Sequence, residues 1–260
     1  MHLTKMQGLG NDYLYHYGEV ENPAELSIKW ADRHFGIGSD GLILIQDSEL
    51  ADFKMRIFNA DGSEAMMCGN GIRCVGKFVY DKGYTTKTTL TIETLSGIRT
   101  LQLDVQEGLV QQATVDMGDV KVEQEITLSV LEQEVRCVPV SVGNPHCIVF
   151  CEDADEAPLT TIGAALERHE QFPQGVNVEF VQILDRHHIR MRVWERGSGI
   201  TMACGTGACA SAAAAVKAGF CDSPLVVKLD GGDLNIEILS DSSARMTGPA
   251  VIVAECDVED

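Results

Sequence analysis

The chain has 260 residues, enough for one or two domains of ordinary size and for a substantial hydrophobic core. Hydrophobic residues make up 45% and charged residues 23%, which excludes a disordered, collagen-like or coiled-coil chain. The formal net charge of −19 repels phosphate backbones and anionic lipids, so neither nucleic acid nor a membrane is expected as a partner.

Targeting and membrane signals are not visible in the sequence. No apolar run approaches the roughly 20 residues of a membrane span, and residues 1–10 lack a basic segment followed by an apolar one. The nine cysteines are odd in number and irregularly spaced, which argues against a disulfide framework. We therefore expect a cytoplasmic protein in which some cysteines have a chemical role.

The residue pattern of the first half of the chain predicts strands and two helices. A helix is expected over residues 26–34. Alternating apolar residues predict strands over residues 54–58 and 89–94, and a helix over residues 72–82 lies between them. The motif Cys-Gly-x-Gly, which begins at Cys68, directly precedes this second helix.

The second half repeats these elements in the same order. A helix is expected over residues 162–169, and strands over residues 188–194 and 235–239. Small residues dominate residues 208–218, which predicts a buried helix after a second Cys-Gly-x-Gly motif at Cys204. The acidic segment 152–158 is expected to be a loop.

A duplication explains this correspondence. The segment MRIFNADGSEAMMCGNG, from Met55, aligns without gaps to MRVWERGSGITMACGTG, from Met191, at an offset of 136 residues. Four further pairs of blocks are collinear with it: GNDY with GNPH, GIGSDGL with GVNVEFV, Ser96-Gly97 with Gly231-Gly232, and VDMG with RMTG. We predict an α+β protein of two pseudosymmetric homologous domains, each a curved sheet wrapped around a central helix. The first covers residues 1–118 and the second residues 119–248.

Each repeated cysteine lies at a place suited to anion binding. The glycines of Cys-Gly-x-Gly let a ligand approach the backbone, and the following helix directs its free N–H groups and positive dipole end there. A helix N-terminus in a favourable geometry stabilises a thiolate by up to ~2 kcal/mol, which would bring a thiol pKa from ~8.5 to about 7. Either Cys68 or Cys204 is thus a candidate thiolate near neutral pH.

Two such cysteines facing each other would form an acid/base pair. At a separation of ~7 Å and an effective dielectric constant of ~20, two thiolates would repel by about 2.4 kcal/mol, so one thiolate and one thiol are preferred. One sulfur could remove the α-proton of an amino acid while the other protonates the opposite face, with no cofactor. A zinc site is disfavoured because the cysteines lack a CxxC knuckle, and the GxGxxA match at Gly205 is a weak dinucleotide signal.

The two halves differ in charge at one aligned place. Asn59-Ala60 in the first half corresponds to Glu195-Arg196 in the second. Glu195 could receive a substrate ammonium, and Arg196 could bind a distal carboxylate through two hydrogen bonds. This difference indicates a ligand that is itself placed unsymmetrically.

The sequence is similar to the diaminopimelate epimerase family over nearly its whole length. The motifs that carry the resemblance are KMQGLGNDY, GIGSDGL, FNADGSEAMMCGNGIRC, GNPHC, GVNVEFV, ERGSG, ACGTGACA and MTGPA. The resemblance implies a PLP-independent epimerase that interconverts LL- and meso-2,6-diaminopimelate in lysine and peptidoglycan precursor synthesis. It also implies the two-domain pseudosymmetric fold of that family, a homodimer, and a C-terminal strand, about residues 249–260, that joins the first domain.

Site residues carried over from the resemblance cover both halves. Cys68 and Cys204 are the implied catalytic residues, His146 the implied supporting residue, and no metal or other cofactor is implied. The implied substrate-binding residues are Asn11, Asn59, Gly69, Asn70, Asn144, Asn177, Glu195, Arg196, Gly205 and Thr206. Departures from the family pattern, such as Ile200 in place of Glu, leave open a racemase of another amino acid, for example histidine. A noncatalytic amino-acid-binding protein is a third hypothesis, disfavoured because binding alone gives no reason for a cysteine in each half.

Overall fold

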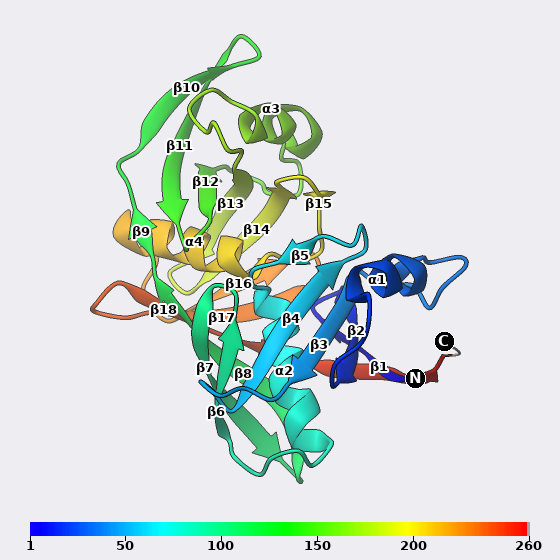
Figure 1. Ribbon diagram of the computed structural model, residues 1–260. Coiled ribbons are helices and arrows are strands. Elements are labelled where there is room, and N and C mark those ends of the chain that lie inside the picture. The colour runs from blue at the N-terminus through cyan, green and yellow to red at the C-terminus, as the bar shows by residue number, and fades with distance from the viewer. Residues whose placement is uncertain (259–260) are drawn as a thin grey trace. The chain divides into compact units, whose positions relative to one another are not determined.

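The structure, a computed structural model, describes residues 1–258 and divides the chain into two units (Figure 1). The first unit comprises Met1–Val115 together with the segment that begins at Gly248, and the second comprises Asp116–Thr247. The chain leaves the first unit within strand β8 (Leu109–Asp119) and returns to it within strand β18 (Ser243–Pro249). The first unit is therefore built from both ends of the chain.

The first unit contains a mixed sheet and two helices. Its remaining elements are β1 (His2–Gly8), β2 (Asn11–Tyr17), α1 (Pro23–Ala31), β3 (Gly41–Gln46), β4 (Phe53–Asn59), β5 (Glu64–Ala65), α2 (Gly69–Asp81), β6 (Thr89–Thr94), β7 (Gly97–Gln106) and β19 (Val251–Asp257). The pairing order is β19-β1-β2-β3-β4-β6-β7-β8, with β5 also beside β4. The pairs β2–β3 and β4–β6 are parallel, and the others are antiparallel.

The second unit repeats this plan. Its remaining elements are β9 (Lys121–Val122), β10 (Ile126–Val130), β11 (Gln133–Ser141), β12 (Pro145–Phe150), the π-helix η1 (Leu159–Gly163), α3 (Ala164–Glu167), β13 (Asn177–Asp185), β14 (His188–Glu195), β15 (Gly199–Ile200), α4 (Gly205–Lys217), β16 (Leu225–Leu229) and β17 (Gly232–Ile238). The order is β11-β12-β13-β14-β16-β17-β18, with β9 and β10 beside β11. Its parallel pairs, β12–β13 and β14–β16, fall at the same places as in the first unit, which confirms the predicted duplication.

Each unit is organised around one nearly buried helix. The residues of α2 from Gly69 to Val79 are all buried, and α2 contacts β1, β2 and β7. In α4 the small residues from Ala208 to Ala215 are buried against β11, β12, β13, β14 and β17. Small side chains let a helix approach the surrounding strands closely. The alanine run that predicted burial therefore also lets the axis of α4 lie close to the sheet. The predicted α+β architecture, a curved sheet around a central helix in each half, is confirmed.

The other predicted helix pair differs from expectation in its bounds. Helix α1 covers residues 23–31, whereas residues 26–34 were predicted. It begins earlier because Pro23 occupies its first turn, where proline is favoured, and it ends earlier because Asp32 has non-helical backbone angles. Its counterpart begins at Leu159, not 162, as a wide π-helical turn in which the Gly163 N–H donates to the Pro158 carbonyl at 3.1 Å. The helix then ends at Glu167, before His169.

One carboxylate in the first unit ties the start of β4 to β6. Asp52 accepts hydrogen bonds from Lys87 Nζ at 2.5 Å, from the Thr91 N–H at 2.8 Å and from Thr91 Oγ1 at 3.0 Å. The Lys87 ammonium and these two donors lower the pKa of Asp52, because all three favour the ionised form.

The Asp52 contacts predict a pH-dependent effect of Asp52→Asn. A lowered folded-state pKa contributes stability above the unfolded-state pKa of about 3.9, and this contribution disappears as pH falls through the folded value. At pH 7 we expect the variant to lose about 1 kcal/mol of unfolding free energy, and the difference should shrink toward pH 3. Urea unfolding at both pH values measures it, and a difference that grows toward acid would contradict the assignment.

None of the helices within residues 1–258 combines the length and the apolar character that a membrane crossing requires.

All nine cysteines of the chain are free thiols.

Candidate active site

Cys68 is the residue at which α2 begins. It is the N-cap of the helix, in extended conformation, and its sulfur accepts a hydrogen bond from the Gly71 N–H at 3.3 Å. The geometry follows from the sequence, because glycine at positions 69 and 71 leaves the first turn without bulky side chains. A Cβ on Gly71 would lie 2.7 Å from Ile43 Cδ1, so this glycine also keeps the helix close to the sheet.

Asn11 contacts Cys68 in the first unit. The thiol donates to Asn11 Oδ1 at 3.3 Å, and the Asn11 amide group in turn donates to Asp40 Oδ2 at 2.7 Å. Asn11 begins β2 and Asp40 immediately precedes β3, so the parallel β2–β3 pair brings the two together.

Asn59 and Asn70, two other predicted residues of the first unit, form hydrogen bonds with neighbouring side chains. The Asn59 amide donates to Ser63 Oγ at 3.0 Å, within the turn between β4 and β5. Asn70 is buried, and its Oδ1 accepts from Arg73 Nη1 at 3.1 Å. A ligand would therefore contact Gly69 and Asn70 through the backbone of the first turn of α2.

Cys204 repeats the arrangement in the second unit. It is the N-cap of α4, its sulfur accepts from the Gly207 N–H at 3.4 Å, and Thr206 Oγ1 lies 3.6 Å from the sulfur. Thr206 Oγ1 also accepts from Asn144 Nδ2 at 3.3 Å. A cysteine side chain that caps its own helix is thus common to both halves.

A buried hydrogen-bonded pair of side chains continues this network. His146 Nε2 contacts Asn144 Oδ1 at 3.1 Å, and Nδ1 contacts Glu179 Oε1 at 2.7 Å. Both side chains of the His146–Glu179 pair have 0% exposure. A Cβ on Gly207 would lie 2.5 Å from Glu179 Oε1, so glycine is required where the helix passes the carboxylate. Predicted as a supporting residue, His146 lies two hydrogen-bonded side chains from Cys204.

Neither Asp40 nor Glu179 is among the predicted site residues. The aligned blocks GIGSDGL and GVNVEFV place the two at the same position, but the strand register does not: Ile43 lies against Gly71 in the first unit where Glu179 lies against Gly207 in the second. The roles of Asp40 and Glu179 therefore follow from their three-dimensional contacts and not from the repeat.

The environment of Cys204 reverses the expected direction of its pKa. Burial raises the pKa of this thiol well above its ordinary value, and the carboxylates of Glu195 and Glu179 raise it further. Hydrogen bonds from Gly207 and Thr206 act in the opposite direction but do not compensate. The prediction of a thiolate from the helix N-terminus alone was therefore wrong for Cys204, because desolvation and two negative charges outweigh the dipole.

The charged pair Glu195-Arg196 lies at the end of β14. Glu195 accepts a short hydrogen bond from Thr201 Oγ1, and the Arg196 N–H donates to Asn177 Oδ1 at 2.9 Å. Arg196 Nη1 donates to the Gln174 carbonyl at 3.0 Å. Asn177 thus fixes the backbone of the turn while its own amide donates to the Pro145 carbonyl at 3.4 Å.

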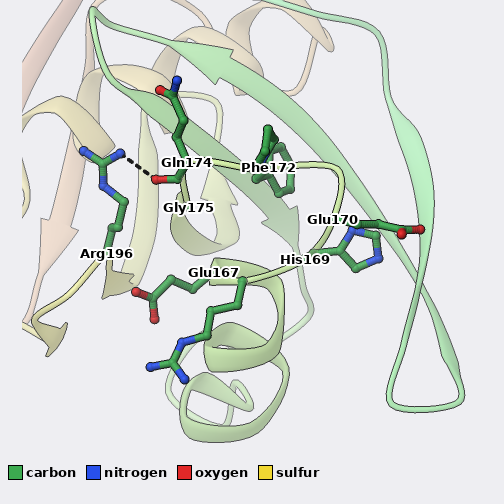
Figure 2. Close-up of a pocket in the computed structure, with 9 residues that line it drawn as sticks. Glu167, His169, Glu170, Phe172, Gln174, Gly175 and Arg196 are labelled. Atoms are coloured by element: carbon green, nitrogen blue, oxygen red, sulfur yellow. Dashed lines mark hydrogen bonds between the residues drawn. The ribbon is translucent and has the colours of Figure 1, made fainter.

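A cavity of about 530 Å³ adjoins Arg196 within the second unit. Figure 2 shows the Arg196 side chain extending toward the segment that carries Gln174 and Gly175, with Glu167 on the neighbouring helix. Gly175 has φ +74°, and a Cβ there would lie 2.8 Å from Arg196 Cδ. Glycine at 175 therefore lets the arginine stem lie across this segment.

Glu167 holds the turn that carries Arg196. Its Oε2 accepts from Trp194 Nε1 at 2.7 Å, and its Oε1 accepts from the Gly197 N–H at 2.8 Å. Burial opposes ionisation, but these donors and the nearby cations Arg168 and Arg196 lower the pKa of Glu167 overall.

We expect Glu167→Gln to lower the unfolding free energy by about 1 to 3 kcal/mol, because its amide group must face a donor at one of these two contacts. Urea unfolding measures the loss. Glu170→Gln, which changes an exposed residue of the same cavity, is the matched control and should leave the transition unchanged. Equal midpoints for wild type and Glu167→Gln would show that the contacts do not hold the turn.

Within residues 1–258, no group of three or more His, Cys, Asp or Glu side chains is placed to hold a metal ion. The cysteine sites are built from thiols, amides, the buried His146–Glu179 pair and backbone N–H groups.

The chain matches the family model described as diaminopimelate epimerase over residues 3–123 and 138–253. It belongs to the diaminopimelate epimerase family. A relative named diaminopimelate epimerase from Methanococcus maripaludis is 52% identical, with 100% of each chain covered. Another of that name, from Acetivibrio thermocellus, is 50% identical and covers 100% of this chain and 99% of its own. The predicted resemblance is confirmed, and membership of the diaminopimelate epimerase family makes the protein an isomerase.

Solved structures with low sequence identity share the fold. A phenazine biosynthesis protein of the PhzF family from Bacillus anthracis superposes with a TM-score of 0.77 at 19% identity, covering 100% of this chain and 99% of that one. A probable proline racemase from Agrobacterium radiobacter gives a TM-score of 0.77 at 15% identity, covering 99% and 92%. The diaminopimelate epimerase family thus shares this architecture with proteins of different names.

Proposed function

We propose that this protein interconverts LL- and meso-2,6-diaminopimelate with Cys68 and Cys204 as its two bases and without a cofactor. The observation that carries the proposal is the repeated N-cap cysteine, whose sulfur in each half accepts an N–H from the first turn of a buried helix. The roughly 50% identity to relatives named diaminopimelate epimerase, over whole chains, supports the choice of substrate.

The proposed reaction moves one proton onto the substrate for each one removed. One cysteine, as a thiolate, takes the α-proton, and the electron pair left on the α-carbon delocalises into the adjacent carboxylate. Free N–H groups at the start of α2 and α4 stabilise that developing charge. The other cysteine, as a thiol, delivers its proton to the opposite face, so the configuration inverts and the two sulfurs exchange protonation states.

The substrate would offset one of the effects that oppose ionisation of Cys204. The carboxylate of Glu195 is one of the charges that raise the pKa of Cys204. A substrate α-ammonium bound at Glu195 would cancel that charge and so favour the thiolate. We assign Arg196 to the distal carboxylate. Further substrate contacts are assigned to Asn11, Asn59, Gly69, Asn70, Asn144, Asn177, Gly205 and Thr206.

Turnover of single stereoisomers in D₂O tests the function. Purified protein is incubated with LL-diaminopimelate, or with L-histidine as the competing substrate, and both α-deuterium incorporation and the change in configuration are followed. We expect inversion of diaminopimelate with deuterium entering at the inverted centre. Inversion of histidine alone would assign the protein to another substrate, and binding without exchange would indicate a noncatalytic role.

The proposal extends to the setting of the enzyme. We place it in the cytoplasm, in lysine and peptidoglycan precursor synthesis, as a homodimer that binds neither nucleic acid nor membranes. The net charge of −19 supports the last point. Light scattering after size exclusion tests the dimer.

A further inference from the structure

A carboxylate lies close to the asparagine of each cysteine site. Asn11 and Asn144 occupy equivalent positions of the repeat, because Leu14 pairs with Leu42 as Cys147 pairs with Val178. Asp40 and Glu179 are not equivalent. Asp40 immediately precedes β3, whereas Glu179 is the third residue of β13 and, like Ile43 of β3, lies against a glycine in the first turn of the helix. The two units therefore use carboxylates from different positions of the repeat.

In the first unit the connection is direct. Asp40 Oδ2 accepts from both Asn11 Nδ2, at 2.7 Å, and the Asp12 N–H, at 3.1 Å. Asp40 Oδ1 accepts from Arg33 Nη2 at 3.0 Å, and the same nitrogen donates to Asp12 Oδ1 at 2.9 Å. Asp40 is thus held by a backbone donor and a guanidinium, independently of Asn11.

In the second unit the connection has one more link. Glu179 contacts His146, and His146 contacts the oxygen of Asn144. The Asn144 amide group consequently faces Thr206. In each unit a carboxylate therefore orients the asparagine, directly in the first and through His146 in the second, but only Asn11 presents its oxygen to the cysteine.

We propose that Asp40 is a positioning residue that fixes the Asn11 amide so that its oxygen accepts the Cys68 thiol proton. An ionised carboxylate has only acceptors, so the Asn11 NH₂ group must face it and the oxygen must face away. An amide oxygen beside a sulfur favours the thiol, and an amide NH₂ group there would favour the thiolate. Under the proposed function, on which this consequence rests, Asp40 favours the thiol form of Cys68, the form that delivers a proton to the substrate.

Peptide-resolved alkylation of the full chain tests the proposal without any substrate. Iodoacetamide reacts with thiolates, and mass spectrometry reports the Cys68 rate relative to that of Cys256 in the same sample. In Asp40→Ala the Asn11 amide can turn, and we expect Cys68 to react about tenfold faster at a fixed neutral pH. Asp52→Ala removes a carboxylate of the same unit that also accepts a backbone N–H, a side-chain donor and a cation, and it should leave the Cys68 rate unchanged.

Asp40→Asn separates orientation from charge. The Asp12 N–H requires an acceptor, so the new amide should keep its oxygen toward that group and toward Asn11. We expect a Cys68 rate within about twofold of wild type. If Asp40→Asn reacts as fast as Asp40→Ala, the negative charge and not the amide orientation controls Cys68, and the proposal is overturned.

A double-mutant cycle tests whether Asp40 acts through Asn11. In an Asn11→Ala background, Asp40→Ala should change the Cys68 rate by less than twofold, whereas a full tenfold effect there would also overturn the proposal. Because alkylation needs no turnover, a protein that fails to epimerise diaminopimelate leaves this test intact. The function and the role of Asp40 can therefore fail separately.

Discussion

Replacing either Cys68 or Cys204 with alanine is expected to lower epimerisation of diaminopimelate on the order of 10³-fold, because each removes one of the two proton-transfer groups. The fold should survive at a modest cost in stability, since alanine fits the space of cysteine but lacks the sulfur that accepts the N–H of Gly71 or Gly207. Initial rates of configurational change measure the loss, and circular dichroism checks the fold.

Two other cysteines supply the controls for this prediction. Cys74 and Cys209 are fully buried in α2 and α4, so they share the helix and the residue type but do not cap it. Cys74→Ala and Cys209→Ala should affect stability more than turnover. A folded Cys68→Ala or Cys204→Ala protein with near-wild-type turnover would rule out the two-base mechanism.

Replacing Arg196 with lysine is expected to weaken diaminopimelate binding by about 1 to 3 kcal/mol while a cation remains. The guanidinium can bind a carboxylate through two parallel hydrogen bonds, and an ammonium cannot. Lysine would also lose the donor that reaches the Gln174 carbonyl. We expect KM to rise roughly 5- to 150-fold with a smaller change in kcat, and steady-state kinetics measures both.

Arg168→Lys is the matched control for Arg196→Lys, because Arg168 lines the same cavity and is exposed. Its kinetics should match those of wild type. α-Proton exchange on an amino acid that lacks a distal carboxylate, if wild type supports it, should fall much less than diaminopimelate turnover in Arg196→Lys. Equal losses for both substrates would mean that Arg196 organises the turn and does not read the distal group.

The sequence predicted the features that depend on repeated local patterns. The duplicated block around Cys68 and Cys204 located two buried helices, and the small residues of α4 indicated that this helix is enclosed. The family resemblance also followed from contiguous motifs. The sequence predicts the two helices and the family motifs because each depends on residues that are close together in the chain.

What the sequence did not predict depends on contacts between distant segments. The Asn59 amide donates to Ser63 because the turn between β4 and β5 brings the two together, although asparagine is also a residue type suited to ligand contact. The raised pKa of Cys204 requires knowing that Glu179, 25 residues earlier in the chain, lies beside it and that both are buried. The π-helical turn at Leu159 likewise depends on the Gly163–Pro158 hydrogen bond and on how Gly163 fits against Trp194 and Phe180.

The pairing of β1 with β19 has a consequence for biosynthesis. On the ribosome, β1 is among the first segments to emerge and β19 follows every other strand, so their sheet cannot close until translation has passed residue 257. The second unit, by contrast, is one continuous segment and can acquire its long-range contacts earlier. The cysteine nearer the N-terminus therefore reaches its finished environment later than the other, because Arg73, which contacts the first turn of α2, also donates to the Pro249 carbonyl.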